Sequence, residues 1–244
     1  MGKIQAITLE TGLRPSLSII IPTLNEAAHL SSTLARIPKT STIEVVIADG
    51  LSQDTTLETA ADLGAKVIVS PRGRGRQMNT GAREAQGEFF LFLHADTLLP
   101  DGFADYIPPI LSRPGVSAGA FRLKFHPPLP GLKLIETLAN WRARTLQLPY
   151  GDQGIFLRAD RFRALGGFAE IPLMEDVELI RRLRRQGRIT IAPLPVTTSS
   201  RRWRDYGVWR TSLINQIILA GYFAGIPAGR LAQWYSNFFR VHHR

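Results

Sequence analysis

The stretch EFFLFLHAD, residues 88–96, decides the fold that this sequence predicts. Its five apolar residues, Phe89 to Leu93, form a run typical of a strand buried on both faces of a parallel sheet. The run ends on His94, Ala95 and Asp96, and histidine and aspartate are costly to bury without partners. Because ligands of open α/β sheets bind beyond the carboxyl ends of the strands, Asp96 is a candidate ligand-binding residue.

Strand and helix patterns alternate through the residues that precede this stretch. Apolar runs at 17–21, 43–48 and 66–69 end in turn residues, and helical patterns lie between them at 26–37, 52–64 and 72–87. This alternation predicts a Rossmann-like α/β fold with a mostly parallel central sheet.

The residues after position 100 are less regular. Their patterns predict a strand at 116–125, a helix at 131–145, a strand and short helix within 153–168, and a helix at 174–187. No linker of disordered composition divides the chain, so we expect one domain over residues 1–244. Within it we distinguish a first half at about 16–100, a second at about 101–200 and a helical segment at about 205–240.

The composition favours a phosphate-bearing or anionic partner. The 244 residues carry a formal charge of +10, and 25 of the 30 basic residues are arginine, whose guanidinium grips phosphate in a bidentate manner. A solvated arginine-rich surface is the alternative interpretation. No cysteine is present, which excludes disulfides and thiol nucleophiles.

The location that the sequence predicts is the cytoplasm. The first 16 residues lack the apolar core of a signal peptide. The longest apolar stretch, 212–235, is interrupted by Asn215, Gln216, Pro227 and Arg230, and a spanning helix needs about 18 uninterrupted apolar residues.

Acidic residues recur where strands end or loops begin, namely Glu26, Asp49, Asp96, Asp152 and the pair Glu175 and Asp176. Several carboxylates at one sheet edge repel one another unless a cation or hydrogen-bond donors compensate. Mg2+ or Mn2+ held by one or two carboxylates and substrate phosphates would compensate, with Asp96 as the leading ligand. The alternative is that Asp96 only caps a helix formed by the residues after it.

The loop PRGRGRQMNTG, residues 71–81, is a second candidate site. Its arginines 72, 74 and 76 could contact a diphosphate, or the loop could be a solvated basic turn. A dinucleotide fingerprint would need a glycine where Met78 stands, and no Walker lysine motif is present. A Ser-His-Asp mechanism has no G-x-S-x-G elbow to support it, and the scattered histidines do not suggest zinc.

Five motifs together resemble glycosyltransferase family 2, the inverting nucleotide-sugar transferases of the GT-A fold. They are SIIIPTLNE, VVIADGLSQDTT, RGRGRQMNTGAREAQGEFFLFLHADT, GDQGIFLRADRFRALGGF and MEDVELIRRLRRQG, and they span about residues 16–200. The HADT form resembles a bacterial subgroup of small, non-processive members. The resemblance implies a hexosyltransferase whose nucleotide-binding half is 16–100 and whose acceptor half is 101–200.

On the donor side, the resemblance implies that a UDP- or GDP-sugar binds with Mg2+ or Mn2+. Asp96 stands where the last aspartate of the D-x-D motif binds the metal, but His94 replaces the first aspartate, with Ala95 between them. The residues that the resemblance assigns to the nucleotide are Pro22, Thr23, Asn25, Glu26, Asp49, Arg74, His94 and Ala95.

On the acceptor side, the resemblance makes Asp176 of the pair Glu175 and Asp176 the general base. Gly151, Asp152 and Gln153 lie in the acceptor region. The stretch SSRRWR resembles the Q-x-x-R-W motif of processive relatives, but Ser199 replaces the glutamine. Arg202 and Trp203 could still close over the diphosphate and the acceptor.

Two other functions remain open on the sequence alone. A nucleotidyltransferase would share the α/β frame and the metal-binding aspartate, and a non-enzymatic protein could use its charge to bind nucleic acid or a membrane. We do not expect a nucleic-acid partner.

The stretch 209–235 has apolar residues at helical spacing between arginines and aromatic residues. It predicts a helix in the interface of an anionic membrane, close to a lipid-linked acceptor, or alternatively a core-packing or homodimer helix.

Overall fold

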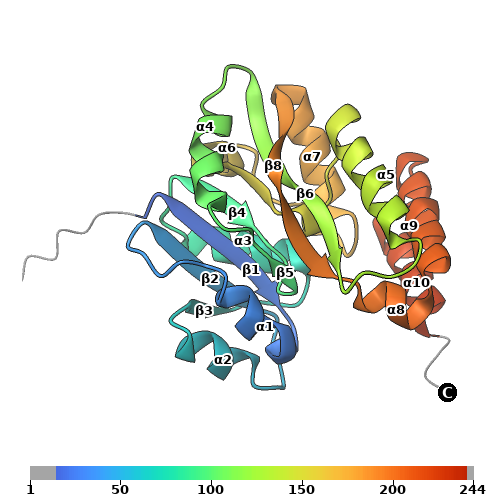
Figure 1. The fold of residues 1–244 in the computed structure, drawn as a ribbon, viewed down its shortest axis with the longest axis horizontal. Helices are drawn as coiled ribbons and strands as arrows, with labels where there is room; N and C mark the ends of the chain where they lie inside the picture. Colours follow the sequence, from blue (N-terminus) through green and yellow to red (C-terminus); the bar gives the residue numbers. More distant parts are fainter. Residues whose placement is uncertain (1–14, 241–244) are drawn as a thin grey trace, which may run out of the picture.

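The computed structural model describes residues 15–240, and one eight-stranded sheet forms the centre of this part of the chain (Figure 1). The strand order across the sheet is β3-β2-β1-β4-β7-β6-β8-β5. The strands are β1 (Leu17–Thr23), β2 (Ile43–Asp49), β3 (Lys66–Val69), β4 (Phe89–Phe92), β5 (Thr97–Leu98), β6 (Val116–His126), β7 (Ile155–Arg158) and β8 (Arg188–Ser199).

Ten α-helices and two short 3-10 helices lie around the sheet in the described residues. They are α1 (Ala27–Leu34), α2 (Thr56–Asp62), α3 (Arg74–Glu84), η1 (Phe103–Tyr106), α4 (Ile107–Leu111), α5 (Leu132–Thr145), η2 (Gly151–Gln153), α6 (Ala159–Ala164), α7 (Glu175–Gln186), α8 (Arg201–Tyr206), α9 (Val208–Phe223) and α10 (Ala228–Arg240).

The first four strands form the parallel part of the sheet. β1 pairs in parallel with β2 and β4, and β2 pairs in parallel with β3. Beyond β4 the sheet is mixed, because β7 is antiparallel to both β4 and β6, β8 is parallel to β6, and β5 is antiparallel to β8. Four of the seven strand pairings among residues 15–240 are therefore parallel, which confirms the expected mostly parallel α/β sheet.

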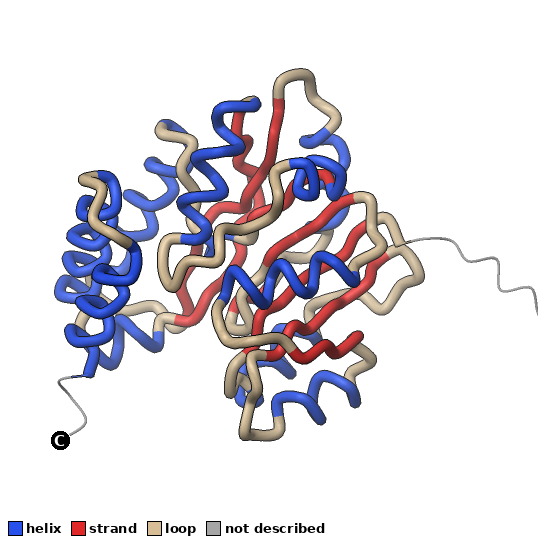
Figure 2. Tube along the Cα trace, turned by 180° about the vertical axis from the view of Figure 1, so that it is seen from behind, coloured by secondary structure: helices blue, strands red, loops and turns tan. Residues whose placement is uncertain are grey.

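Helices cover both faces of the sheet, so alternate residues of each strand enter different cores. In β1, Ile19 and Ile21 pack with α1 and α4 on one face, while Ile20 packs with α3 and α7 on the other. Successive side chains of a strand point to opposite faces, which explains why β1 and β4 are apolar throughout. Figure 2 shows helices over the face that lies behind the sheet in Figure 1.

The sequence analysis missed β8, which runs beside β6. The segment contains Pro193 and Pro195, and proline within a run argues against a central strand because it cannot donate to the ladder. The structure accommodates both prolines at an irregularity, where the register to β6 shifts between Ala120 and Arg122.

The C-terminal stretch that was predicted as one helical segment is two helices, α9 and α10. The chain turns between them at Gly225, whose φ of 85° suits glycine, and Pro227 follows just before α10. Ile214, Ile218 and Leu231 form the buried contact between the two helices. No helix among residues 15–240 combines the length and hydropathy needed to cross a bilayer.

Candidate active site

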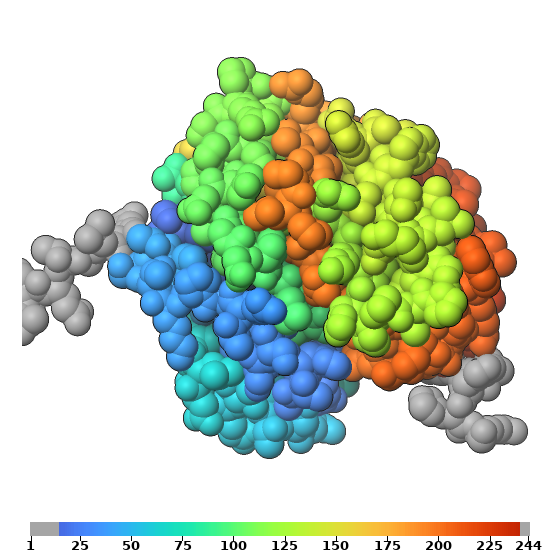
Figure 3. Space-filling model, viewed as in Figure 1, coloured from blue at the N-terminus to red at the C-terminus, as the bar shows by residue number. Residues whose placement is uncertain are grey.

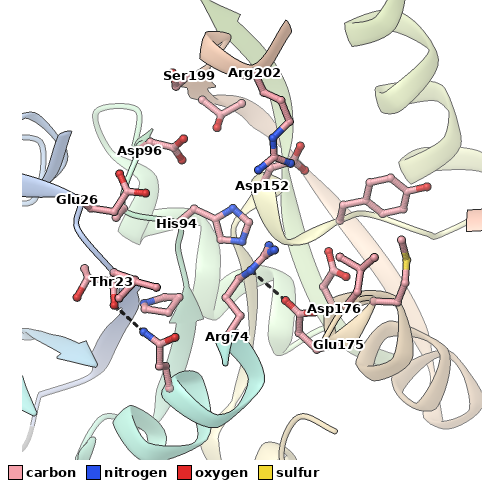
Figure 4. Close-up of a pocket in the computed structure, with 18 of the residues that line it drawn as sticks. Thr23, Glu26, Arg74, His94, Asp96, Asp152, Glu175, Asp176, Ser199 and Arg202 are labelled. Atoms are coloured by element: carbon pink, nitrogen blue, oxygen red, sulfur yellow. Dashed lines mark hydrogen bonds and ion pairs between the residues drawn. The ribbon is translucent and has the colours of Figure 1, made fainter. Parts of the chain in front are cut away.

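A cleft of about 540 Å³ opens at the carboxyl ends of β1 and β4. The N-termini of α3 and α7, the end of β8 and the helices α8, α9 and α10 complete its wall. Of the residues proposed from the sequence, Pro22, Thr23, Glu26, Arg74, His94, Ala95, Asp96, Asp152, Glu175, Asp176, Arg202 and Trp203 line it. Figure 4 shows most of their side chains converging on one space.

Two carboxyl groups, those of Asp96 and Glu26, lie on the sheet side of the cleft. Glu26 is half-buried and has one carboxyl oxygen, Oε2, without a hydrogen-bond partner. Burial raises the pKa of Glu26, the charge of Asp96 raises it further, and Arg201, whose Nη2 lies 3.7 Å from Oε1, opposes the rise. Two neighbouring carboxylates, one of which has an oxygen without a hydrogen-bond partner, are suited to binding a divalent cation.

Few side chains are available to bind such a cation. Residues 15–240 contain no group of three histidine, aspartate or glutamate side chains able to hold a metal. A Mg2+ ion is commonly held by one or two carboxylates plus waters and substrate phosphates, so Asp96 with the adjacent Glu26 fits that requirement.

Arg74, the first residue of α3, joins the N-termini of two helices. Its Nε lies 3.3 Å from Oε1 of Glu175, the first residue of α7 (Figure 4). Burial raises the pKa of Glu175 and the neighbouring Asp176 adds to the rise, whereas Arg74 opposes it. At the next residue, Gly75, a Cβ would lie only 2.6 Å from the carbonyl oxygen of Ala169. Glycine at 75 therefore permits the close approach that brings Arg74 to Glu175.

Asp176 is held in the cleft by backbone donors. Its Oδ2 accepts the N–H of Gly151 at 2.6 Å, and its Oδ1 accepts the N–H of Val177 at 2.8 Å. A Cβ at Gly151 would lie 2.8 Å from Nε2 of His94 and 3.3 Å from Oδ2 of Asp176. The bond between Gly151 and Asp176 therefore depends on the absence of a side chain at position 151.

His94 lies near the middle of the cleft, between residues from several elements (Figure 4). Burial lowers the pKa of His94 to about 3, and the charges of Arg74 and Arg202 add to the decrease. The imidazole is therefore neutral at physiological pH, and unlike an aspartate it would supply no negative charge to a cation bound here.

Asp152 and Tyr150 line the cleft, and each has a buried polar atom without a partner in the described residues. Oδ1 of Asp152 and the hydroxyl of Tyr150 are buried and make no hydrogen bond within residues 15–240. Burial raises the pKa of Asp152 to about 6; Asp176 and Asp96 also raise it, and Arg142 opposes them. Burial also raises the pKa of Tyr150 to about 12, so its hydroxyl remains a hydrogen-bond donor. A carboxyl acceptor beside a phenol donor suits a ligand that carries hydroxyl groups.

Six proposed residues do not line the cleft, although each lies close to it in the chain. Two belong to the arginine loop: Arg72 donates to the carbonyl of Gly50, and Arg76 pairs with Glu170 at 2.9 Å. Asp49 is fully buried, and its carboxylate accepts hydrogen bonds from Thr23 Oγ1 and from the N–H and Oγ of Ser52. Asn25 accepts the N–H of Gln53, and Gln153 donates to the carbonyl of Phe121. Gly151 reaches the cleft only through its bond to Asp176.

The sequence analysis overlooked several residues of the wall. Gln77 is buried and donates from Nε2 to the carbonyls of Thr23 at 2.7 Å and Ala48 at 2.9 Å, which joins α3 to the ends of β1 and β2. Gln77 lies within the arginine loop at residues 71–81, so its position in the sequence could have identified it as a site residue. Asn215 and Tyr235 enter from α9 and α10, and nothing in the local pattern indicated them.

Arg202 and Trp203 connect the cleft to the C-terminal helices. Arg202 donates to the hydroxyl of Tyr235 in α10. The Trp203 ring packs 4.4 Å from that of Phe125, and its Nε1 donates to Ser212 in α9. Trp203 is thus packed and hydrogen-bonded at the edge of the cleft.

Comparison with protein families and known proteins adds independent findings. Residues 18–158 match the model of glycosyl transferase family 2. A PGL/p-HBAD biosynthesis glycosyltransferase of Mycobacterium bovis is 40% identical over 94 residues, which is 35% of this chain and 37% of the relative. The match thus spans little more than a third of that relative.

Solved structures share the fold at low sequence identity. A mannosyltransferase from Pyrobaculum calidifontis in complex with GDP-Man and Mn2+ has a TM-score of 0.66 and 21% identity, covering 84% of this chain and 62% of that one. Glucosyl-3-phosphoglycerate synthase from Mycobacterium tuberculosis, in complex with Mn2+, UDP and glucosyl-3-phosphoglycerate, has a TM-score of 0.55 and 19% identity, covering 74% and 70%. These likenesses confirm the fold class that the sequence predicts.

Proposed function

This chain belongs to glycosyl transferase family 2, and on that premise we propose that it transfers a sugar, with inversion, from a nucleoside-diphosphate donor to an acceptor hydroxyl. One observation carries the proposal: Asp96, at the carboxyl end of the sheet, and Asp176, at the N-terminus of α7, line the same cleft. The first suits a cation and its diphosphate, and the second suits a base.

We call Glu26 and Asp96 the donor wall. A Mg2+ or Mn2+ ion held there would neutralise charge on the leaving diphosphate, which lowers the barrier to its departure. The guanidinium groups of Arg74 and Arg202 lie across the cleft and supply further positive charge for the phosphates (Figure 4).

We call Asp152, Glu175 and Asp176 the acceptor wall. Asp176 takes the proton of the acceptor hydroxyl while the hydroxyl oxygen attacks the anomeric carbon and the bond to the diphosphate breaks. The N–H groups of Gly151 and Val177 orient the Asp176 carboxylate. Glu175, paired with Arg74, positions α7 and with it the base. Asp152 and Tyr150 receive other hydroxyls of the acceptor.

The nucleotide lies, in this proposal, along the ends of β1 and β2. Pro22, Thr23 and Glu26 line the cleft there, with His94 and Ala95 beside them. Asn25 and Asp49 act through their hydrogen bonds to the loop at 52–53, which shapes the pocket for the base and ribose.

The names of the structural neighbours favour particular donors and a particular metal. One neighbour is a mannosyltransferase complex with GDP-Man and Mn2+, and another holds UDP and Mn2+. We therefore propose a UDP- or GDP-sugar as donor. Family membership disfavours the two alternative functions, nucleotidyl transfer and a purely non-enzymatic role.

A thermal-shift panel of UDP, GDP, dTDP and their sugars, each with and without Mn2+, tests the proposal. A ligand that binds only the folded state stabilises it by about 2.7 kcal/mol at a hundred times its dissociation constant. We expect one nucleotide to raise the melting temperature only when Mn2+ is present. Stabilisation by a nucleoside triphosphate and a sugar phosphate, with pyrophosphate as product, would instead indicate nucleotidyl transfer.

A further inference from the structure

Three of the four tryptophans of this chain are exposed. Trp141 at the end of α5 is 58% exposed, Trp209 at the start of α9 is 62% exposed, and Trp234 in α10 is 43% exposed. Only Trp203 is largely packed. Tryptophan is highly buried on average in proteins, and it is enriched where an apolar surface meets water, as at membrane interfaces.

Helix α9 carries two apolar stripes, one buried and one exposed. Its inner residues Ile214 and Ile218 are buried against α10. On the outer face Trp209, Leu213 and Ile217 follow one another at a spacing of four residues, and all three are exposed. A surface helix normally has a polar outer face, whereas this second stripe leaves three large apolar side chains largely exposed.

Helix α5 repeats this arrangement beside α9. Its buried residues Leu132 and Ala139 pack on the sheet, whereas Leu134, Leu138 and Trp141 are exposed. Trp209 lies against the start of α5, since a Cβ at Gly131 would lie 3.1 Å from its ring. Figures 1 and 3 show α5 and the C-terminal helices next to each other at one end of the molecule.

The segments that carry these stripes are strongly basic. Residues 201–239 contain five arginines and one aspartate, and residues 131–146 contain three basic residues and one glutamate. Arg144 and Lys133 are exposed on α5, and Arg204 and Arg230 on the C-terminal helices. Cations around an amphipathic apolar surface attract anionic lipid headgroups.

We propose that the outer faces of α5 and α9 bind the surface of an anionic lipid bilayer. Trp141, Trp209 and the exposed leucines of the two stripes enter the headgroup and acyl boundary, and the exposed Arg144 and Arg230 contact lipid phosphates. A second copy of the chain fits less well, because a two-fold interface would set this basic surface against itself.

The proposal goes beyond sugar transfer and does not depend on it, but the two are compatible. Asn215 of α9 lines the cleft, so the bound surface and the cleft share this helix. If the proposed transfer holds, an acceptor carried on a lipid would reach the cleft from that surface.

Co-sedimentation of the full chain with phosphatidylglycerol-containing vesicles, without any donor, tests the proposal. We compare Leu213→Glu with Val69→Glu, a matched control on β3 at the opposite side of the sheet. The side chains of Leu213 and Val69 are exposed to a similar degree, 62% and 58%. Both variants change the net charge by the same amount. Because the bound leucine would lose its apolar contact, we expect Leu213→Glu to lower partitioning about tenfold and Val69→Glu to leave it unchanged.

Other results would overturn the proposal. Wild-type chain that stays in the supernatant at low salt shows that no bilayer binds. If both variants lose vesicle binding to the same extent, charge alone drives the binding. If both variants bind vesicles as well as the wild type does, another surface of the chain contacts the bilayer. A dimer in light scattering that Leu213→Glu converts to monomer, without vesicle binding, would show that a second copy covers α9. Circular dichroism of both variants confirms that they are folded.

Discussion

The donor wall and the acceptor wall of the cleft hold their carboxyl groups in opposite ways. On the donor wall, Glu26 keeps an oxygen without a partner next to Asp96. On the acceptor wall, Glu175 is paired with Arg74, and both oxygens of Asp176 accept backbone N–H groups. In the proposed function a cation would complete the donor wall, whereas most of the acceptor wall is already organised by the protein.

The largest effect that this comparison predicts is on turnover in Asp176→Asn. General-base catalysis contributes about 10²- to 10⁴-fold, and an amide cannot take the acceptor proton. We expect turnover to fall by at least about 100-fold, with donor affinity changed by less than about threefold, in steady-state kinetics and donor calorimetry. Asp160→Asn, an exposed acid on α6, is the control. A variant with a tenth or more of normal turnover would place the base elsewhere.

The next effect is on metal-dependent donor binding in Asp96→Asn. The donor wall has few ligands, so the loss of one carboxylate should weaken donor binding in Mn2+ by about tenfold or more, equivalent to about 1.4 kcal/mol. Calorimetry with and without Mn2+ measures the change. Asp101→Asn, whose side chain is almost fully exposed, serves as the control. Equal donor affinity in Asp96→Asn and wild type would remove the distinction between the walls.

Asp152→Asn should stabilise the protein while it impairs acceptor binding. The pKa of Asp152 is raised to about 6 in the folded state, above its ordinary value near 4, so ionisation of this group disfavours folding. The cost appears as pH rises through the range between about 4 and 6 and is complete above it. The asparagine variant should therefore be more stable than wild type by about 1–3 kcal/mol at pH 8.

Urea unfolding at pH 8 and near pH 4 checks this prediction. The stability difference between variant and wild type should shrink as pH falls from 8 to 4, because wild-type Asp152 becomes protonated in the folded state and then increasingly so in the unfolded state. A difference that is constant with pH would show that the ionisation of Asp152 is not responsible.

The smallest effect should come from Arg201→Gln, which removes the ion-pair partner of Glu26 in the donor wall. The ion pair of Arg201 with Glu26 is long, at 3.7 Å, and the arginine is about half exposed, so solvent screens it. We expect a loss of at most about 1 kcal/mol of unfolding free energy. Thermal unfolding at low and high salt measures it, and a loss of several kcal/mol would mean that the donor wall is held by the protein as firmly as the acceptor wall.

The parallel half of the fold was predictable because its signals are local. The buried runs around Ile19 and Leu91 are apolar on both faces, which marks parallel strands before any pairing is known. β8 was not predictable, since Pro193 and Pro195 argue against a strand and only its pairing with β6 overrides them. Gly225 and Pro227 indicate the turn between α9 and α10. The helical spacing of the apolar residues on both sides of them predicted a single helix instead.

The residues of the site also fall into those that the sequence could predict and those that it could not. Residues that stand where strands end, such as Asp96, or where a helix begins, such as Asp176, could be proposed from position alone. Contributions from distant elements could not, because no local pattern shows that Asn215 and Tyr235 reach the cleft or that Gly151 must approach His94.

The packing of Met174 has a consequence for regulation. Met174 precedes the carboxylate pair of α7 with a left-handed backbone, at a φ of 68°, and it packs with Leu173 against the buried contact of α9 and α10. Any event that alters this contact changes the free energy of the turn that carries Asp176. Thermodynamic linkage is reciprocal, so an occupant of α9 that alters ligand affinity in the cleft must itself bind with an affinity that depends on that ligand.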